Sequence, residues 1–352
     1  MNINEIYAIG LMSGTSIDGI DLVYVKFLKN SHKNFKILAS ETVAYSLEWK
    51  QMLQNGIHFS SEELLQLDIS YGKHLGVVLN NFIHNYKIET LDFIASHGHT
   101  ILHQPEKGIT LQVGSGKEIA KITKQKVVCD FRTQDVKLGG QGAPLVPIGD
   151  ELLFSEFDFC LNLGGFSNVS FNKNNERVAF DICPVNIVLN FYANKIGLEY
   201  DASGKIASEG KLNQELLDAL NSLDFYSRKP PKSLGLEWVQ KEIFPLINKF
   251  EVDVSSVLRT FVEHVAIQIA KIIKDSKAVL ITGGGVYNSF LMERLKCYTN
   301  VKVVESSDAL INYKEALIFA FLGVLKIDNQ VNCLQSVTGA SKNHSSGVIF
   351  LP

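Results

Sequence analysis

The sequence predicts an α/β protein built from two related halves that flank a cleft. A strand–glycine turn–strand hairpin opens the first half at 5–28, and a second hairpin of this kind opens the other half at 157–171. The second half later contains a strand that runs into Gly-Gly-Gly and a helix, at 278–295. These three observations favour a duplicated α/β domain over one doubly wound sheet, whose first strand would lead into a helix.

The elements of the first half follow from hydrophobic periodicity. Apolar and polar residues alternate along 17–28, as expected for a strand that pairs with 5–11. An apolar stripe at helical spacing predicts a helix over 61–86 with Ser61 as its N-cap. The other elements expected in this half are strands at 42–45, 93–96, 110–113 and 127–130 and a short helix at 117–124.

The second half continues the alternation of strands and helices. Its hairpin joins 159–163 to 168–171, and its clearest helix is 255–274, where apolar residues recur every three or four positions. The other elements expected here are strands at 178–181, 278–282 and 301–304 and helices at 185–196, 212–221, 288–295 and 313–325.

Composition narrows the class of protein. Of the 352 residues, 46% are hydrophobic and 20% are charged, which is typical of a folded chain of about two domains. The net charge of -3 disfavours a nucleic-acid partner bound through a basic surface. The five cysteines form no C-x-x-C pair, so we expect reduced thiols. Without a leader-like segment or an apolar run of roughly 20 residues, we expect a cytoplasmic protein with no membrane partner.

The turn of the first hairpin carries the strongest chemical signal. The segment GLMSGTSIDG at 10–19 holds glycines, whose amides can face an anion, and three hydroxyl side chains. It lacks the Lys-Ser/Thr pair of a Walker A loop, and a strand follows it where a Rossmann turn would lead into a helix. We therefore expect this turn to bind phosphate, with Asp18 holding Mg²⁺ through water.

Two glycine turns in the second half point to the same class of ligand. Gly164-Gly165 repeats the pattern of the first hairpin, although a simple turn explains this pair equally well. Gly283-Gly284-Gly285 stands between a strand and a helix, where a flat ligand or a phosphate can approach the backbone closely. Nucleotide binding is the favoured interpretation of this second turn.

Asp181 is the candidate catalytic carboxylate. It is expected at the end of a strand, just before a helix that begins at Pro184, and strand ends in α/β folds face the ligand crevice. Capping of that helix is a second role open to the same side chain. Cys183 is expected to be a buried apolar residue rather than a nucleophile.

Three further residues are candidate substrate contacts. His97 lies in SHGHTILH, which lacks a nearby Cys or a helical H-E-x-x-H pattern, so we expect hydrogen bonding to substrate rather than metal binding. Arg132 could grip a substrate carboxylate with its bidentate fork or pair with Asp135. Glu315 could accept a hydrogen bond from a sugar hydroxyl or complement the dipole of its helix.

Taken together, these segments resemble the anhydro-N-acetylmuramic acid kinase family. The resemblance covers nearly the whole chain, and the combination of MSGTSxDG with GGQGAPLVP is specific. The matching segments, in chain order, are GLMSGTSIDGIDL, SHGHTILHQP, LQVGSG, DFRTQDV, GGQGAPLVP, LNLGGFSNVS, PPKSLG, ITGGGVYN, KEALIFAFLG and VTGAS.

The resemblance implies a fold and a nucleotide. The fold is the two-domain actin-like ATPase (ribonuclease H-like) duplicated fold with an interdomain nucleotide cleft, its first domain at 1–145 with 335–352 returning to it and its second at 146–334. The two hairpins become phosphate-binding turns for ATP and Mg²⁺, and Gly-Gly-Gly becomes the adenosine-side turn. The expected nucleotide contacts are Gly14, Thr15, Ser16, Ile17, Asp18, Gly19, Ile20, Asp21, Gly164, Gly165, Gly283, Gly284 and Gly285.

The resemblance also implies a reaction. Water opens the 1,6-anhydro bond of anhydro-N-acetylmuramic acid while O6 receives the γ-phosphoryl group, giving N-acetylmuramic acid 6-phosphate and ADP. Asp181 falls where the family has its catalytic Asp and would deprotonate that water, and Arg132 and Glu315 match positions around the sugar. The implied role is peptidoglycan recycling in a bacterial cytoplasm, by an enzyme that forms a homodimer.

One segment departs from the family pattern. The family usually reads F-D-T-G-P-G-N, whereas this chain reads FDICPVN at 180–186. The changes add bulk and remove a hydroxyl donor close to Asp181. They motivate two alternatives: a kinase for another anhydro sugar such as levoglucosan, or a nucleotide-binding sensor that has lost turnover.

Overall fold

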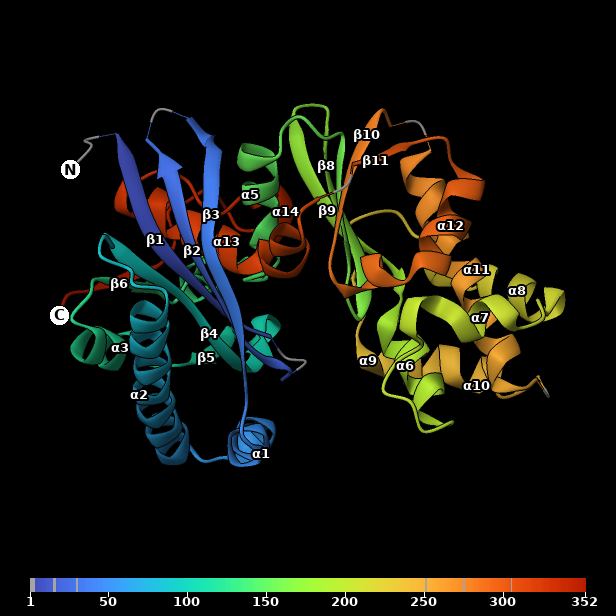
Figure 1. The fold of residues 1–352 in the computed structure, drawn as a ribbon, viewed down its shortest axis with the longest axis horizontal. Coiled ribbons are helices and arrows are strands. Elements are labelled where there is room, and N and C mark those ends of the chain that lie inside the picture. The colour runs from blue at the N-terminus through green and yellow to red at the C-terminus, as the bar shows by residue number, and fades with distance from the viewer. Residues whose placement is uncertain (1–3, 15–16, 30, 251, 275, 305) are drawn as a thin grey trace. The chain divides into compact units, whose positions relative to one another are not determined.

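The chain divides into two compact units. A computed structural model describes residues 4–14, 17–29, 31–250, 252–274, 276–304 and 306–352. The first unit comprises Met1–Leu153 and Tyr313–Pro352, and the second is Phe154–Asn312. Each unit contains its own sheet and its own helices (Figure 1).

The sheet of the first unit is built around a three-stranded hairpin. Its described strands are β1 (Glu5–Ser13), β2 (Gly19–Leu28), β3 (Ser31–Ala44), β4 (Phe93–Gln104), β5 (Ile109–Val113), β6 (Val127–Cys129) and β12 (Val348–Phe350). They lie in the order β12-β6-β4-β1-β2-β3, with β5 paired to β4. β1, β2 and β3 are antiparallel in sequence order, whereas β4 is parallel to β1 and β6 is parallel to β4.

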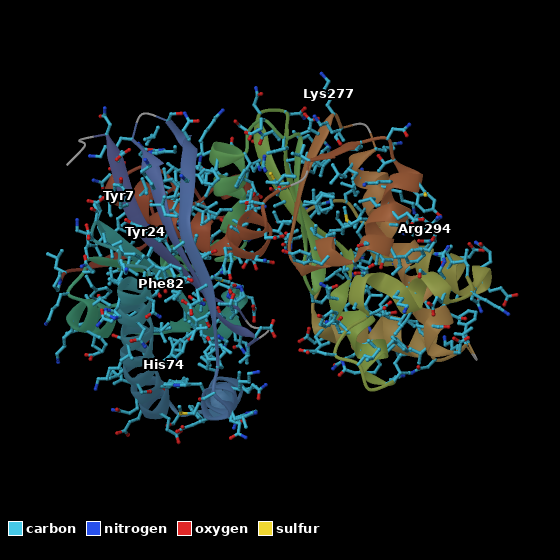
Figure 2. All side chains as sticks on the ribbon, viewed as in Figure 1. Tyr7, Tyr24, His74, Phe82, Lys277 and Arg294 are labelled. Atoms are coloured by element: carbon cyan, nitrogen blue, oxygen red, sulfur yellow. The ribbon has the colours of Figure 1, made fainter. Side chains whose placement is uncertain are left out.

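Helices cover this sheet and close its core. They are α1 (Leu47–Asn55), α2 (Ser61–Asn85), α3 (Gly116–Thr123), α4 (Thr133–Lys137), α5 (Val146–Leu153), α13 (Asp308–Ile327) and α14 (Gln335–Thr338). The N-cap of α2 is Ser60 rather than the predicted Ser61, because Ser60 and Glu63 form a reciprocal capping box. Phe82 of α2, labelled in Figure 2, is buried in the core beneath the sheet.

The second unit repeats the strand order of the first. Its described strands are β7 (Phe159–Leu163), β8 (Phe166–Lys173), β9 (Glu176–Pro184), β10 (Ala278–Thr282) and β11 (Lys302–Val304), in the order β11-β10-β7-β8-β9. Three consecutive antiparallel strands are again followed by two parallel ones. The repeated order confirms the predicted duplicated α/β fold.

The helices of the second unit pack around α11. They are α6 (Asn186–Asn194), α7 (Lys205–Glu209), α8 (Gln214–Asn221), α9 (Leu236–Trp238), α10 (Phe244–Ile247), α11 (Val254–Ile273) and α12 (Ser289–Tyr298). Arg294 of α12, labelled in Figure 2, donates two hydrogen bonds to the buried Glu263 of α11. This ion pair ties α12 to the central helix.

Helix α13 packs in the first unit, although the predicted second domain of 146–334 included it. A Cβ atom on Gly10 of β1 would lie 1.9 Å from the carbonyl oxygen of Ala316, so the helix lies directly on the strand. Phe321 of α13 also contacts Phe27 of β2, with ring centroids 5.7 Å apart. The backbone of α13 kinks at Tyr313, the first residue of this segment that belongs to the first unit.

Two element boundaries differ from their predictions in ways that affect the site. The strand expected at 42–45 is the end of the much longer β3. The strand that carries Asp181 continues to Pro184, and α6 begins at Asn186 rather than at Pro184. Asp181 therefore lies within β9, three residues before its end, and does not cap the helix.

Candidate active site

The hairpin turn of the first unit follows the point where the end of β1 pairs with the middle of β4. Ser13, the last residue of β1, is aligned with His99 in the parallel pairing of β1 and β4. The Gly14 carbonyl accepts a hydrogen bond from the Ile17 amide at 3.1 Å. Thr15 and Ser16, both expected to contact the nucleotide, lie outside the described residues.

Four buried polar side chains form a hydrogen-bonded network at the end of β1, next to this turn. The Ser13 hydroxyl is hydrogen-bonded to Tyr45, Tyr71 and His99 Nδ1 at 2.5, 3.0 and 3.0 Å, and the two tyrosine hydroxyls are 2.5 Å apart. Burial lowers the pKa of His99 to about 4, so this ring is neutral at pH 7. The network joins α2, β4 and Tyr45, which directly follows β3, to Ser13 of the predicted phosphate-binding segment.

The second half of the turn presents carboxylates. Gly19 has no room for a side chain, since a Cβ atom there would lie 2.7 Å from Thr42 and 2.9 Å from the Val43 carbonyl. Burial raises the pKa of Asp21, a hydrogen bond from Thr42 lowers it, and the negative charge of Asp18 raises it. Asp18 itself is exposed, whereas Ile20 is fully buried, so a ligand could reach only the backbone of Ile20.

Arg132 is held by His97 and by the loop after α4. Its Nε donates to His97 Nε2 at 3.0 Å, and its Nη1 donates to the Gly142 carbonyl at 2.6 Å. His97 Nδ1 in turn donates to the Gly98 carbonyl at 2.9 Å, which fixes a neutral ring with Nε2 as acceptor. Both ring nitrogens of His97 thus form hydrogen bonds within the protein. His97 therefore orients Arg132 and leaves no ring nitrogen for the substrate contact that was predicted.

One of the two roles predicted for Arg132 was an ion pair with Asp135. The structure shows no hydrogen bond between these two side chains. Asp135 instead accepts hydrogen bonds from the Gly142 amide and the Thr338 hydroxyl. Burial lowers the pKa of Arg132 to about 10, a shift opposed by the charge of Glu315. The guanidinium therefore remains protonated at pH 7, and Glu315 is its charged neighbour.

Glu315 follows the kink in α13 and is exposed. The preceding Lys314 is buried and forms an ion pair with the equally buried Asp150 of α5, at 2.8 Å. This pair fixes the first turn after the kink, so the carboxylate of Glu315 is carried on a rigid segment.

In the second unit, the structure brings the two predicted glycine turns together. β10 is parallel to β7, with Thr282 aligned with Asn162, so both turns follow at the same edge of the sheet. A Cβ atom on Gly283 would lie 2.8 Å from the Leu163 carbonyl, and one on Gly285 would lie 2.7 Å from the Leu163 Cβ. Gly284, by contrast, has no atom within 4 Å of that position and faces open space.

The Gly164-Gly165 turn is bound to the start of α6. The Gly165 carbonyl accepts from the amides of Val185 and Ile187, and the Gly164 carbonyl accepts from the Asn186 amide at 3.3 Å. These bonds satisfy amides that a helix start would otherwise leave free. They fix the glycine turn relative to β9, the strand that carries Asp181.

Asp181 is half-buried and is contacted by the loop that precedes α9. Its Oδ2 accepts the Leu234 amide at 2.7 Å, and its own amide donates to the Lys232 carbonyl at 3.1 Å. Burial raises the pKa of the carboxyl, and the Leu234 hydrogen bond partly opposes this shift. Within the described part of the chain, Oδ1 has no hydrogen-bond partner. Asp181 is therefore a carboxylate with one oxygen fixed and one available.

The departures from the family pattern after Asp181 lie in the core of the second unit. The pairing of β8 with β9 shifts its register here, so that Asp181 is aligned with Asn168 and Cys183 with Ser167. Ile182, Cys183 and Val185 are all buried in the core, with at most 3% of any of them exposed. The added bulk fills the interior, and Cys183 is the buried thiol that was predicted.

Sequence reasoning missed the partners of the predicted residues. Leu234 and Lys232 contact Asp181 through backbone hydrogen bonds. Leu234 lies 53 positions from Asp181 in the sequence, and no local pattern predicts such a contact. Both residues lie in the segment PPKSLG, which carries part of the family resemblance. That resemblance was the one feature of the sequence that could have indicated a role for them. Tyr45 and Tyr71, beneath the first turn, looked like ordinary apolar-face residues of a strand and a helix.

A family model described as anhydro-N-acetylmuramic acid kinase matches residues 6–352. Proteins of that name from Xanthomonas oryzae pv. oryzae (strain MAFF 311018) and Shewanella sp. (strain ANA-3) are 33% and 34% identical over 99% of this chain, and the matches cover 98% and 99% of those proteins. Component A of the Acidaminococcus fermentans (R)-2-hydroxyglutaryl-CoA dehydratase matches with a TM-score of 0.45 and 15% identity, over 90% of this chain and 96% of its own.

The protein is a phosphotransferase built from two α/β units. The chain belongs to the anhydro-N-acetylmuramic acid kinase family, which confirms the resemblance of its motifs. Among the described helices, none combines the length and the apolar character that a membrane crossing requires.

Proposed function

We propose that this enzyme opens 1,6-anhydro-N-acetylmuramic acid with water and transfers the γ-phosphoryl group of ATP to O6. In the anhydro sugar, O6 is bonded to C1 and carries no proton, so phosphorylation at O6 requires that the C1–O6 bond break. The water oxygen bonds to C1, the C1–O6 bond breaks, O6 attacks the γ-phosphorus, and ADP leaves. The products are N-acetylmuramic acid 6-phosphate and ADP.

Asp181 is the proposed general base, and its environment is the observation that carries the proposal. Its Oδ1 is available to a water molecule, while the Leu234 amide fixes Oδ2. Burial raises the pKa of Asp181, which makes the carboxylate a better proton acceptor than an ordinary aspartate. A second carboxylate is not required, because O6 leaves onto phosphorus instead of taking a proton.

Arg132 and Glu315 are the proposed contacts to the sugar. Arg132 keeps its charge, and its Nη2 is not used in its bonds to His97 and Gly142. A guanidinium in this state suits the carboxylate of the lactyl group. The exposed Glu315 can accept a hydrogen bond from a sugar hydroxyl or amide. His97 acts by orienting Arg132.

The glycine turns of both units are the proposed contacts to ATP. Gly284 leaves open space above its backbone, as close approach by a nucleotide requires. Mg²⁺ prefers carboxylate oxygens, and the neighbouring charges of Asp18 and Asp21 provide a fitting donor set. When bound there, Mg²⁺ would neutralise charge that develops on the phosphate oxygens during transfer.

A single substitution tests this mechanism. We expect Asp181→Asn to lower the rate of ADP release with anhydro-N-acetylmuramic acid by at least about 100-fold, since the amide cannot take the proton of water. The exposed Asp218 of α8 gives a matched control, and Asp218→Asn should leave the rate unchanged. Equal turnover of the wild type and Asp181→Asn would refute the role of Asp181.

The proposed cellular role rests on the membership of this chain in the family. The enzyme would act in peptidoglycan recycling in a bacterial cytoplasm, where the anhydro sugar is returned to amino-sugar metabolism, and would do so as a homodimer. Light scattering on the purified protein tests the homodimer, which predicts twice the chain mass of 39.1 kDa.

A further inference from the structure

A buried cluster in the first unit joins Asp135 to two residues near the C-terminus, Cys333 and His344. Cys333 and His344 form an isolated antiparallel bridge, with reciprocal backbone hydrogen bonds of 3.1 and 3.2 Å. Residues directly opposite each other in such a bridge hold their side chains side by side. Both side chains are buried, and both lie against the fully buried Asp135 of α4.

The three side chains point one ligand atom each at a common centre. Cys333 Sγ lies 3.0 Å from Asp135 Oδ1, and His344 Nε2 lies 3.6 Å from the same oxygen. All three atoms lie within 4.8 Å of one another. Atoms bound to one tetrahedral ion, each about 2.0–2.3 Å from the metal, lie roughly 3.3–3.8 Å apart. The pair at 3.6 Å matches this spacing, and the pair at 3.0 Å would have to widen slightly.

The hydrogen bonding of His344 is a second, independent indication of a bound cation. Its Nδ1 donates to the Lys342 carbonyl at 3.1 Å, which leaves Nε2 as a lone-pair nitrogen in the neutral ring. Nε2 is buried and has no hydrogen-bond partner among the described residues, yet it faces the carboxylate of Asp135. Asp135 Oδ1 accepts hydrogen bonds from the Cys333 thiol and the Thr338 hydroxyl at 3.0 and 2.8 Å, so within the described part of the chain His344 Nε2 is the atom left without a partner. A cation bound between the three ligand atoms would give this buried nitrogen the partner it lacks.

We propose that Asp135, Cys333 and His344 bind one Zn²⁺ ion. A thiolate, an imidazole and a carboxylate are all ligands that Zn²⁺ takes, and a water molecule would complete the tetrahedron. Cys333 loses its proton to solvent as its sulfur bonds to the metal. The thiolate and the carboxylate together balance the charge of the ion, so the buried site is neutral.

The consequence of this site is structural. The other oxygen of Asp135 accepts the Gly142 amide at 2.7 Å, and the Gly142 carbonyl accepts from Arg132. The ion would therefore fix the C-terminal segment, α4 and the loop that holds Arg132 to one another. This inference is independent of the proposed reaction and is tested without ATP or sugar.

The test uses the full-length chain without an affinity tag, stripped with a chelator under reducing conditions. After equilibration with Zn²⁺ and removal of free ion, we expect one zinc per chain by elemental analysis. With Co²⁺ in place of Zn²⁺, we expect a thiolate-to-metal charge-transfer band in the near ultraviolet. Cys333→Ser should abolish that band and weaken zinc binding by more than roughly tenfold, since even outer-shell changes cost that much.

Two further variants keep the test decisive. Cys297→Ser removes the exposed cysteine of α12 and should keep both the band and the zinc. His344→Asn should weaken zinc binding while keeping a folded chain, and it serves with the wild type if Cys333→Ser does not fold. The proposal is overturned if the wild type retains no zinc, shows no thiolate band, or shows a band that survives in Cys333→Ser.

Discussion

At the scale of single residues, backbone groups from distant loops set the chemistry of the two key charges. The Leu234 amide stabilises the ionised form of Asp181, against a burial effect that favours the protonated form. The Gly142 carbonyl similarly accepts a hydrogen bond from Nη1 of Arg132. The Leu234 contact requires no particular side chain at that loop position. Gly142, by contrast, has a φ of 69°, and a Cβ atom there would lie 2.9 Å from Val136, so this loop position requires glycine.

The hydrogen bond from the Leu234 amide leads us to expect a specific pH dependence of the activity. Asp181 must be ionised to accept a proton, so activity is lost as the pH falls through its pKa, and the raised pKa places this loss above that of an ordinary aspartate. Leu234→Pro removes the amide hydrogen, which should raise the pKa further and move the acid limb of kcat/KM to higher pH. Leu234→Ala keeps the amide and should leave the limb in place; a shift in both variants would rule out the amide as the cause.

His97 makes a second prediction, about substrate binding. Without its Nε2 acceptor, the Arg132 guanidinium is less well oriented, and a hydrogen bond to a charged group contributes about 1.5–3 kcal/mol. We expect His97→Ala to raise the KM for the sugar by about tenfold or more, with a smaller change in kcat, and His97→Gln to restore part of the loss. The exposed His103 is the control, and an effect of His103→Ala equal to that of His97→Ala would contradict the assignment.

At the scale of elements, the glycine turn after β10 separates packing from ligand access. Gly283 has φ of 87° and ψ of 159°, a region open almost only to glycine, and it packs against β7. Gly284 has neither constraint. The same tripeptide thus holds one residue that the fold needs and one that can face a nucleotide.

This contrast predicts different outcomes for two similar substitutions. Gly283→Ala should lower the stability by about 1–3 kcal/mol, seen as a lower Tm, because the backbone is strained and the new methyl meets Leu163. Gly284→Ala should leave the Tm unchanged but raise the KM for ATP, since the methyl occupies the open side of the turn. An equal loss of Tm in both variants would show that Gly284 also serves the fold.

At the scale of the whole molecule, local patterns predicted the duplication but not the connections between distant segments. Glycine turns and alternating strands are local, so both hairpins and the helix over 255–274 were predictable. Most of β3 was not, because this edge strand is largely polar and partly exposed, and its pairing with β2 determines its conformation.

The placement of α13 was unpredictable for a related reason. It follows the second unit in sequence, but the close approach of Ala316 to Gly10 places it on β1. The site shows the same limit: Asp181, Arg132 and Glu315 stood out as charged residues in motifs, whereas Leu234, Gly142 and Tyr71 act through contacts across the fold.

The identity of the product tests the central claim most directly. With anhydro-N-acetylmuramic acid and ATP, the account predicts a sugar product heavier by one phosphoryl group and one water, whose phosphorus couples to the protons on C6 in NMR spectra, and one ADP per sugar. An intact anhydro ring with phosphate on another hydroxyl would contradict coupled opening and transfer. So would ADP formed without any phosphorylated sugar, which would mark an ATPase.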